Sequence, residues 1–537
     1  MRRYCLIAGC FGLLLVCDCG AARNRTELAM KPAPQYALGV VFHDANHNGV
    51  RDPGEAGLGR VRVSNGCRIV RTDAQGRYRL PIDDDTILFV IKPSGWMTLV
   101  NDDNLPRFYY VHKPGGSDDL KHPGVAPTGP LPDSVDFALV RHPELGQFGA
   151  VFLGDPQPYA QKEIDYLAHD VVEELIGTDA MFGVTLGDIV GDDLSLLDSI
   201  NRTIGLIGVP WYSVLGNHDL NQDSPDDPRS DETFERVFGP AYYSFDYGRV
   251  HFLVLDDVIW TGATDGTEAS YIGGLDPEQL RFIRNDLALV PANRLVVLMM
   301  HIPLLTPEGS EPLFRPADRE ALFGILEKHP HTLSLSAHWH MQQHCFFGRA
   351  DGWNGPEPHH HLICATACGS WWKGAPDEAG IPHTTMRDGA PNGYSIITFD
   401  GHRYSIVFKA ARRPADHQMT IFAPEEVAAG NTAQAEVFVN VFAGSQRSRV
   451  EMRLGRQGPW IAMRRIEAED PYYAAMKEAE QSPRPPAGRA LPDAENCPHL
   501  WQVPLPADAP RGTHLIHVRT TDMFGQTYTA HRVIRIR

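Results

Sequence analysis

The sequence has few cysteines, only one long apolar run and no excess of positive charge. Of its 537 residues, 9 are cysteine, and the formal net charge is −18. An acidic chain offers no broad basic surface, so we expect neither a nucleic-acid polymer nor an anionic membrane as partner. Acidity does not exclude a phosphate substrate, because bound divalent cations can supply positive charge locally.

The apolar run lies at residues 4–17, directly after Arg2 and Arg3. We expect residues 1–22 to be a secretory signal peptide, cut after Ala22, and residues 23–35 to be a linker. The run falls short of the roughly 18 apolar residues that a membrane span requires, so it predicts no transmembrane anchor. A lipid anchor on Cys10 is the alternative. Either way, the predicted location is secreted or periplasmic.

The cysteines outside this segment do not predict a disulfide framework. Five remain, an odd number: Cys67, Cys345, Cys364, Cys368 and Cys497. At most, Cys345 would pair with Cys364 or Cys368. A zinc pair at Cys364 and Cys368 is the alternative to the buried strand thiols that we favour.

The alternation of apolar and polar residues divides the rest of the chain into three parts. Residues 36–140 alternate in the manner of strands between glycine-rich turns, which predicts an all-β module. Residues 146–412 place apolar strands between helical segments, which predicts a central α/β domain. Residues 416–537 return to strand-like alternation, which predicts a β-rich domain, with a β-sandwich as the favoured form.

A loop in the first module has the spacing of a calcium site. Gly49 stands at loop position 6, where a sharp turn is needed, and oxygen donors occupy the ligand positions. The candidate ligands are Asp44, Asn46, Asn48, the carbonyl of Val50, Asp52 and Glu55. A metal-free turn rich in Asp and Asn is the alternative, because few of these ligands are carboxylates. In both cases the role would be structural.

Five short motifs in the central domain each follow an apolar strand. They are Gly154-Asp155-Pro156-Gln157, Gly187-Asp188-Ile189-Val190-Gly191-Asp192, Gly216-Asn217-His218-Asp219, His301, and His338-Trp339-His340. Strand ends are where α/β folds gather their functional residues. Carboxylate and amide oxygens together with imidazoles suit divalent metals such as Mn, Fe or Zn.

These motifs, in this order, resemble those of the calcineurin-like metallophosphoesterase superfamily over residues 146–412. The resemblance implies a four-layer α/β sandwich with two divalent metals. The implied ligands are Asp155 and His340 for the first metal, Asn217, His301 and His338 for the second, and Asp188 as the bridge. His218 would be the catalytic acid, with Asp219 orienting its ring. Asp192 would either orient a ligand or cap the following helix.

The first motif departs from the superfamily's common Asp-x-His pattern. Here the third residue is Gln157, whose amide oxygen would serve as a ligand of the first metal. A similar substitution is found in branches such as the manganese-dependent ADP-ribose/CDP-alcohol diphosphatases. Because an amide oxygen is a harder and weaker ligand than an imidazole, we expect Mn or Mg to be favoured over Zn, with Mn first.

A glycine-flanked loop with two adjacent tryptophans follows the last ligand. Two neighbouring tryptophans cannot both be buried on one strand face, so Trp371 or Trp372 should be free to contact a substrate. Arg387 or Lys373 would pair with a second phosphate. Packing of this loop against the C-terminal domain is the alternative. We interpret the nearby run His359–His361 as a polar loop entering a strand rather than as a third metal site.

The sequence therefore predicts a secreted metal-dependent phosphodiesterase or pyrophosphatase that acts on a small molecule. A phosphomonoesterase or a protein phosphatase is the alternative within the same enzyme class. A non-catalytic protein that binds glycan or envelope is the alternative of another class. The sequence specifies neither the substrate nor the oligomeric state.

Overall fold

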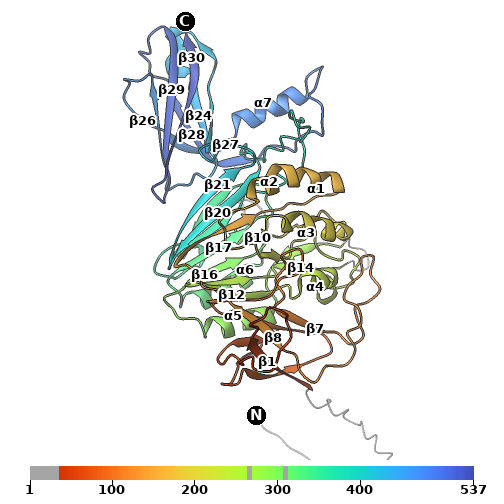
Figure 1. Ribbon diagram of the computed structural model, residues 1–537. Coiled ribbons are helices and arrows are strands. Elements are labelled where there is room, and N and C mark those ends of the chain that lie inside the picture. The colour runs from red at the N-terminus through yellow and green to blue at the C-terminus, as the bar shows by residue number, and fades with distance from the viewer. Residues whose placement is uncertain (1–34, 263–268, 306–312) are drawn as a thin grey trace, which may run out of the picture.

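The computed structural model describes residues 35–262, 269–305 and 313–537 (Figure 1). The predicted signal peptide, most of the linker and the candidate lipidation site lie outside them. Figure 1 shows the N-terminal strands at one end, two central sheets, and the C-terminal strands at the other end. Within the described ranges, no helix combines the length and the apolar character needed to cross a membrane.

The N-terminal module consists of two four-stranded sheets. The strand orders are β4-β1-β8-β6 and β3-β2-β5-β7. The bounds are β1 Gln35–His43, β2 Arg62–Ser64, β3 Ile69–Arg71, β4 Arg77–Ile82, β5 Thr86–Ile91, β6 Trp96–Met97, β7 Tyr109–His112 and β8 Phe137–Arg141. The predicted all-β character is confirmed.

This module shares its hydrophobic core with the central domain. The ring of Phe89 on β5 lies edge-on to Phe282, with centroids 5.7 Å apart. Across the same boundary, Arg62 of β2 forms ion pairs with Asp246 and Asp286, with N–O distances of 2.8 and 2.7 Å. The N-terminal module is therefore packed firmly against the central domain.

The central domain contains two large mixed sheets: the first has antiparallel strands along one edge, and the second has them at both edges. One has the order β11-β10-β9-β20-β21, and the other β12-β13-β16-β17-β19-β18. The first comprises β9 Gln147–Leu153, β10 Gly183–Leu186, β11 Trp211–Val214, β20 Gly393–Asp400 and β21 Arg403–Ala410. The second comprises β12 Tyr243–Tyr247, β13 Val250–Val254, β16 Leu295–Met299, β17 Thr332–Ser336, β18 Gln343–Phe347 and β19 His359–Ile363. A short hairpin, β14 Val258–Trp260 with β15 Tyr271–Gly273, lies beside them.

Helices connect the parallel strands and bury one face in the common core. Helices α1 and α3 contact each other, as do α5 and α6. The bounds are α1 Gln161–Leu167, α2 Glu173–Leu175, α3 Leu197–Gly205, α4 Glu232–Phe238, α5 Pro277–Leu287 and α6 Pro316–Leu326. A π-helical turn, Ala168–Val172, joins α1 to α2, so these elements form one continuous helix with an irregular turn.

The C-terminal domain has two sheets packed around a core of its own. Their orders are β22-β24-β28-β27 and β23-β30-β29-β25-β26. The bounds are β22 Met419–Phe422, β23 Glu426–Val427, β24 Glu436–Val441, β25 Arg449–Leu454, β26 Ile461–Ala462, β27 Arg464–Glu469, α7 Pro471–Glu480, β28 Asn496–Pro504, β29 Gly512–Thr521 and β30 Thr527–Ile536. The predicted β-rich domain is confirmed.

Candidate metal centre

The five motifs converge because they follow parallel strands of the two central sheets. Asp155, Asp188 and Asn217 come after β9, β10 and β11 of one sheet. His301 and His338 come after β16 and β17 of the other. Since the carboxyl ends of parallel strands meet at one edge, loops far apart in sequence become neighbours there.

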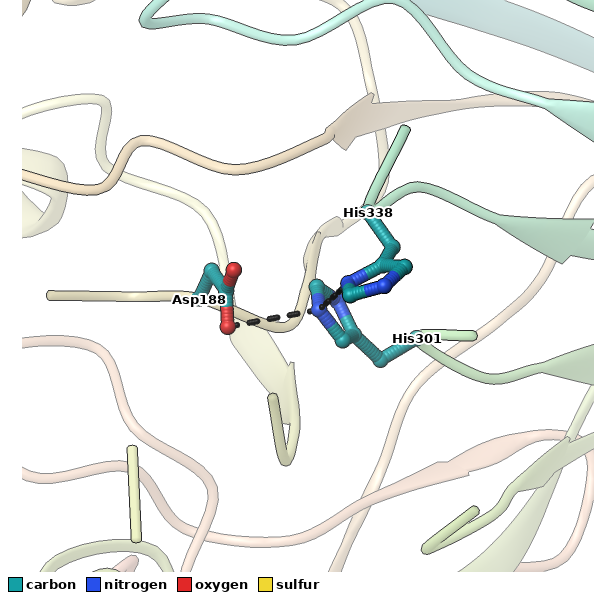
Figure 2. A group of neighbouring side chains, drawn as sticks. All are labelled: Asp188, His301 and His338. Atoms are coloured by element: carbon teal, nitrogen blue, oxygen red, sulfur yellow. Dashed lines mark hydrogen bonds and ion pairs between the residues drawn. The ribbon is translucent and has the colours of Figure 1, made fainter. Parts of the chain in front are cut away.

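Asp188, His301 and His338 form a compact group at this edge (Figure 2). Their ligand atoms lie within 4.8 Å of one another. His301 Nε2 is 3.3 Å from Asp188 Oδ1, 3.1 Å from His338 Nδ1 and 3.1 Å from Asn217 Oδ1. The structure thus brings together the three residues predicted to hold the second metal and the predicted bridge.

The arrangement of these atoms fits a cation. His301 Nδ1 lies 2.8 Å from the carbonyl oxygen of Leu186, and because a carbonyl only accepts, this nitrogen carries the proton. In a neutral ring, Nε2 then presents a lone pair toward the oxygens of Asn217 and Asp188. Several acceptors facing one point need a positive charge between them.

The two histidines of this group have opposite pKa shifts. Burial opposes the imidazolium form of His301, but Asp188 and Asp155 outweigh burial and raise its pKa to about 10. Burial and the neighbouring His301 lower the pKa of His338 to about 3. His338 is therefore neutral at physiological pH, as a metal ligand must be.

The residues predicted for the first metal lie beside this group. Asp155 accepts a hydrogen bond from the backbone nitrogen of His338 at 3.0 Å, and its Oδ1 is 3.6 Å from His301 Nδ1. His340 donates from Nδ1 to the carbonyl of Gly369 at 2.6 Å, which leaves Nε2 available as a ligand. Burial lowers the pKa of His340 to about 4, so this ring is also neutral.

Gln157 is placed by two contacts that sequence reasoning did not predict. Its Nε2 donates to the hydroxyl of Tyr159 at 3.2 Å, and its Oε1 lies 4.0 Å from the Cys368 thiol. The same thiol is 3.6 Å from His340 Nδ1. Cys368 thus lies behind both candidate ligands, and it is free, as are the other four cysteines in the described part of the chain.

Five candidate ligands adopt a left-handed backbone that side chains other than glycine rarely take. The φ angles are +32° for Asp155, +40° for Gln157, +48° for Asp188, +69° for His338 and +54° for His340. Such strain persists only where the surroundings fix it, and it gathers at functional sites. The five positions therefore point to a function at this sheet edge.

The ring of His218 is oriented by Asp192, not by Asp219 as the sequence predicted. His218 Nδ1 lies 2.6 Å from Asp192 Oδ1, and His218 Nε2 lies 4.0 Å from Asp188 Oδ2. Asp219 is fully buried and accepts from the backbone nitrogens of Ile189, Val190 and Gly216 instead. These bonds connect the loop after β10 with the loop after β11 and use both carboxylate oxygens of Asp219. The cap of the next helix comes from Asp193, which accepts from Ser195 N.

Comparison with known families gives three matches in chain order. They are the N terminal of calcineurin-like phosphoesterase at residues 45–122, calcineurin-like phosphoesterase at 151–342, and the C terminal of calcineurin-like phosphoesterase at 361–528. The chain is a calcineurin-like phosphoesterase with N- and C-terminal flanking domains. Members of this family are hydrolases that act on phosphate esters, and they hold a binuclear metal centre.

No curated protein matches this phosphoesterase. Among solved structures, a purple acid phosphatase from yellow lupin (Lupinus luteus) seeds is similar at 14% identity with a TM-score of 0.34. The match covers 65% of this chain and 66%, just under two thirds, of the lupin chain. A likeness at this level says nothing about the substrate or the metals.

The two adjacent tryptophans of the phosphoesterase lie in different surroundings. Trp372 is fully buried, and its indole nitrogen donates to the carbonyl of Pro156 at 3.0 Å, so it is not a substrate residue. Trp371 is half-buried and stacks on His340, with ring centroids 3.9 Å apart. Arg387 lines the same cavity as Trp371 but is ion-paired with Glu495 of the C-terminal segment. The predicted packing against the C-terminal domain is therefore present as well.

Two further sequence interpretations concern sites away from this centre. His359–His361 form the buried strand β19, not a polar loop; the rings of His359 and His361 bond to Ser334 at 2.7 Å each. The six candidate calcium ligands lie in one loop after β1, where Glu55 accepts from Ala45 N and Asp52 N. Calcium binding there stays a prediction.

Proposed function

We propose that the protein is a secreted, two-metal phosphodiesterase or pyrophosphatase that hydrolyses a small extracytoplasmic molecule. The observation that carries the proposal is the convergence of the Asp188, His301, His338 and Asn217 donor atoms on one point. Asp155, Gln157 and His340 would hold the first metal beside this point. The secreted location is supported only by residues 1–22.

The chemistry proposed for the centre depends on cations that these residues would hold. Two divalent ions bound there would supply positive charge to the phosphoryl oxygens and lower the pKa of the attacking water. We favour Mn over Fe, Mg and Zn because Gln157 offers an amide oxygen where an imidazole is common.

The protein's own residues would handle the proton of the leaving group. Burial disfavours the imidazolium form of His218, yet Asp188 and Asp192 outweigh burial and raise its pKa to about 9. His218 is then protonated at neutral pH and can donate from Nε2 to the departing oxygen, while Asp192 holds Nδ1 and fixes the ring.

A metal-dependent substrate panel tests this function. Purified protein, freed of metal and reloaded with Mn, Fe, Mg or Zn, would be assayed on bis-p-nitrophenyl phosphate, p-nitrophenyl phosphate and nucleoside diphosphate sugars. We expect hydrolysis with Mn and a preference for diesters or diphosphates. Faster turnover of p-nitrophenyl phosphate would favour a phosphomonoesterase or a protein phosphatase. No turnover with any metal would contradict the enzyme proposal and favour a non-catalytic binding protein.

A further inference from the structure

A cavity of about 720 Å³ lies beside the metal centre, between the tryptophan loop and the C-terminal segment. Its wall includes Trp371, whose indole stacks on the candidate ligand His340. It also includes Tyr159, which bonds Gln157 and lies edge-on to His218, with ring centroids 6.1 Å apart. Two residues of the cavity wall, Trp371 and Tyr159, therefore contact candidate ligands of the metal centre.

Almost every charge in this wall is already neutralised by a partner. Arg489 pairs with Glu163 and also donates to the carbonyls of Trp371 and Trp372 at 3.0 Å. Arg387 pairs with Glu495 and donates to the Asp493 carbonyl. The carboxylate of Asp493 faces Lys477 at 3.8 Å.

Lys373 is the exception. In the described part of the chain its ammonium has no hydrogen bond and no ion pair, and it lies 5.3 Å from the centroid of the Trp371 ring. The indole holds the side chain near the metal centre without neutralising it. Because the Trp371 ring centroid lies 3.9 Å from that of His340, the ammonium of Lys373 is held near a candidate metal ligand.

An unpaired ammonium beside a metal centre distinguishes between classes of phosphate substrate. A simple monoester or diester carries its only phosphate on the metals and has no further anion for Lys373. A diphosphate carries a second phosphate one P–O–P bridge from the first, which is a further anion that Lys373 could bind. A compact point charge on a flexible stem suits such a group.

We infer that Lys373 is a substrate-binding residue that selects diphosphates, with the reacting phosphate at the metal centre and the second phosphate at Lys373. This inference rests on the proposed function. Water supplies the oxygen of the new P–O bond and releases a proton to solvent, and the bond from the attacked phosphorus to the bridging oxygen breaks. The second phosphate leaves with that oxygen and its electron pair. The products are two phosphate monoesters.

Kinetics on two nucleotide substrates test the inference. Mn-loaded protein would be assayed on UDP-glucose, which has two phosphates, and on p-nitrophenyl thymidine 5′-phosphate, which has one. We expect Lys373→Ala to raise KM for UDP-glucose at least about tenfold, as the loss of a charged hydrogen bond implies, with kcat and the one-phosphate kinetics within about twofold. Lys373→Arg should restore most of the affinity, and the surface variant Lys328→Ala should change neither substrate.

A binding experiment tests Lys373 without relying on turnover. ADP and AMP would be titrated calorimetrically into the Mn-loaded protein at fixed free Mn. We expect ADP to bind at least about tenfold more tightly than AMP, and Lys373→Ala to abolish this difference. Equal affinities in the wild-type protein, or an ADP preference that survives in Lys373→Ala, would overturn the inference. Absence of turnover together with a Lys373-dependent ADP preference would refute only the proposed function.

Discussion

Nδ1 of His218 lies 2.6 Å from Oδ1 of Asp192, a residue 26 positions earlier in the chain. This contact leaves Nε2 as the ring atom that faces Asp188. The hydrogen bond with His218 also lowers the pKa of Asp192, so the pair is held as an ion pair. Because the loops after β10 and β11 each carry one partner, the acid is positioned only when both loops are in place.

Replacing Asp192 should impair catalysis in a way that depends on the leaving group. In Asp192→Asn the ring of His218 loses its orienting carboxylate, so we expect kcat to fall about 10- to 100-fold for substrates with alkoxide leaving groups. p-Nitrophenolate needs little protonation, and its release should slow far less. Steady-state kinetics on both substrate types would measure this. Asp193→Asn is the control, because residue 193 accepts from Ser195 N rather than from His218 and an asparagine can keep that cap. An equal loss on both substrates would contradict the assigned role.

Removing a metal ligand should abolish turnover without unfolding the protein. We expect Asn217→Ala and His340→Ala to lose activity and to retain fewer bound metals per chain, because each removes a donor from one of the two cation positions. Elemental analysis would measure the metal content, and circular dichroism would verify the fold. Full activity in either variant would show that the ligand assignment is wrong.

Changing Gln157 should alter metal preference rather than fold. In Gln157→His an imidazole replaces the amide oxygen, so we expect the activity profile to shift from Mn toward Zn or Fe. Competition among these metals during reconstitution, followed by assay, would show the shift. An unchanged profile would mean that Gln157 does not reach the metal.

The two adjacent tryptophans should respond differently to truncation. Trp372 is fully buried, so Trp372→Ala should lower the free energy of unfolding by about 3–5 kcal/mol. Trp371 lines the cavity, and Trp371→Ala should raise KM with a much smaller effect on stability. Chemical denaturation and steady-state kinetics on both variants would separate the roles. Similar destabilisation by both changes would argue against Trp371 as a wall of the substrate site.

The buried ion cluster between the N-terminal module and the central domain should make stability pH-dependent. His251 Nδ1 lies 2.7 Å from Asp246 and Nε2 2.9 Å from Asp286, and Arg62 pairs with both carboxylates. Burial opposes the charge of His251, but the two carboxylates outweigh it and raise the pKa. Two further cations lie at Asp246: Arg294 is 3.5 Å from its carboxylate, and the Lys92 ammonium donates to its carbonyl at 2.6 Å.

The raised pKa of His251 sets the direction in which stability changes with pH. The contribution of protonated His251 is complete below the pKa of an unfolded histidine, about 6.5, and is lost as pH rises through the higher folded-state pKa. We therefore expect the Tm difference between wild type and His251→Gln to be largest below about pH 6.5 and to shrink as the pH rises above it. Calorimetry would measure it, with the exposed His169→Gln as control. A difference that does not change with pH would contradict the prediction.

The candidate ligands were predictable because short motifs after apolar strands carry strong local information. Asp155, Asp188, Asn217, His301 and His338 each follow a strand at the sheet edge, as the apolar runs indicated. Contacts between distant segments were not predictable. The pairing of His218 with Asp192 rather than Asp219, and the burial of Trp372 rather than Trp371, depend on which side of a loop faces a neighbour.

The sequence by itself determined the three-part architecture and the donor types of the candidate metal centre, because apolar periodicity and residue types are local properties of the chain. Only the tertiary structure decided which charges around that centre are already paired. Arg489, more than 100 residues from the tryptophan loop, is bound to its carbonyls and to Glu163, and this leaves Lys373 as the unpaired cation in the described wall of the cavity. Charge pairing depends on distances across the fold, and no pattern of neighbouring residues encodes them.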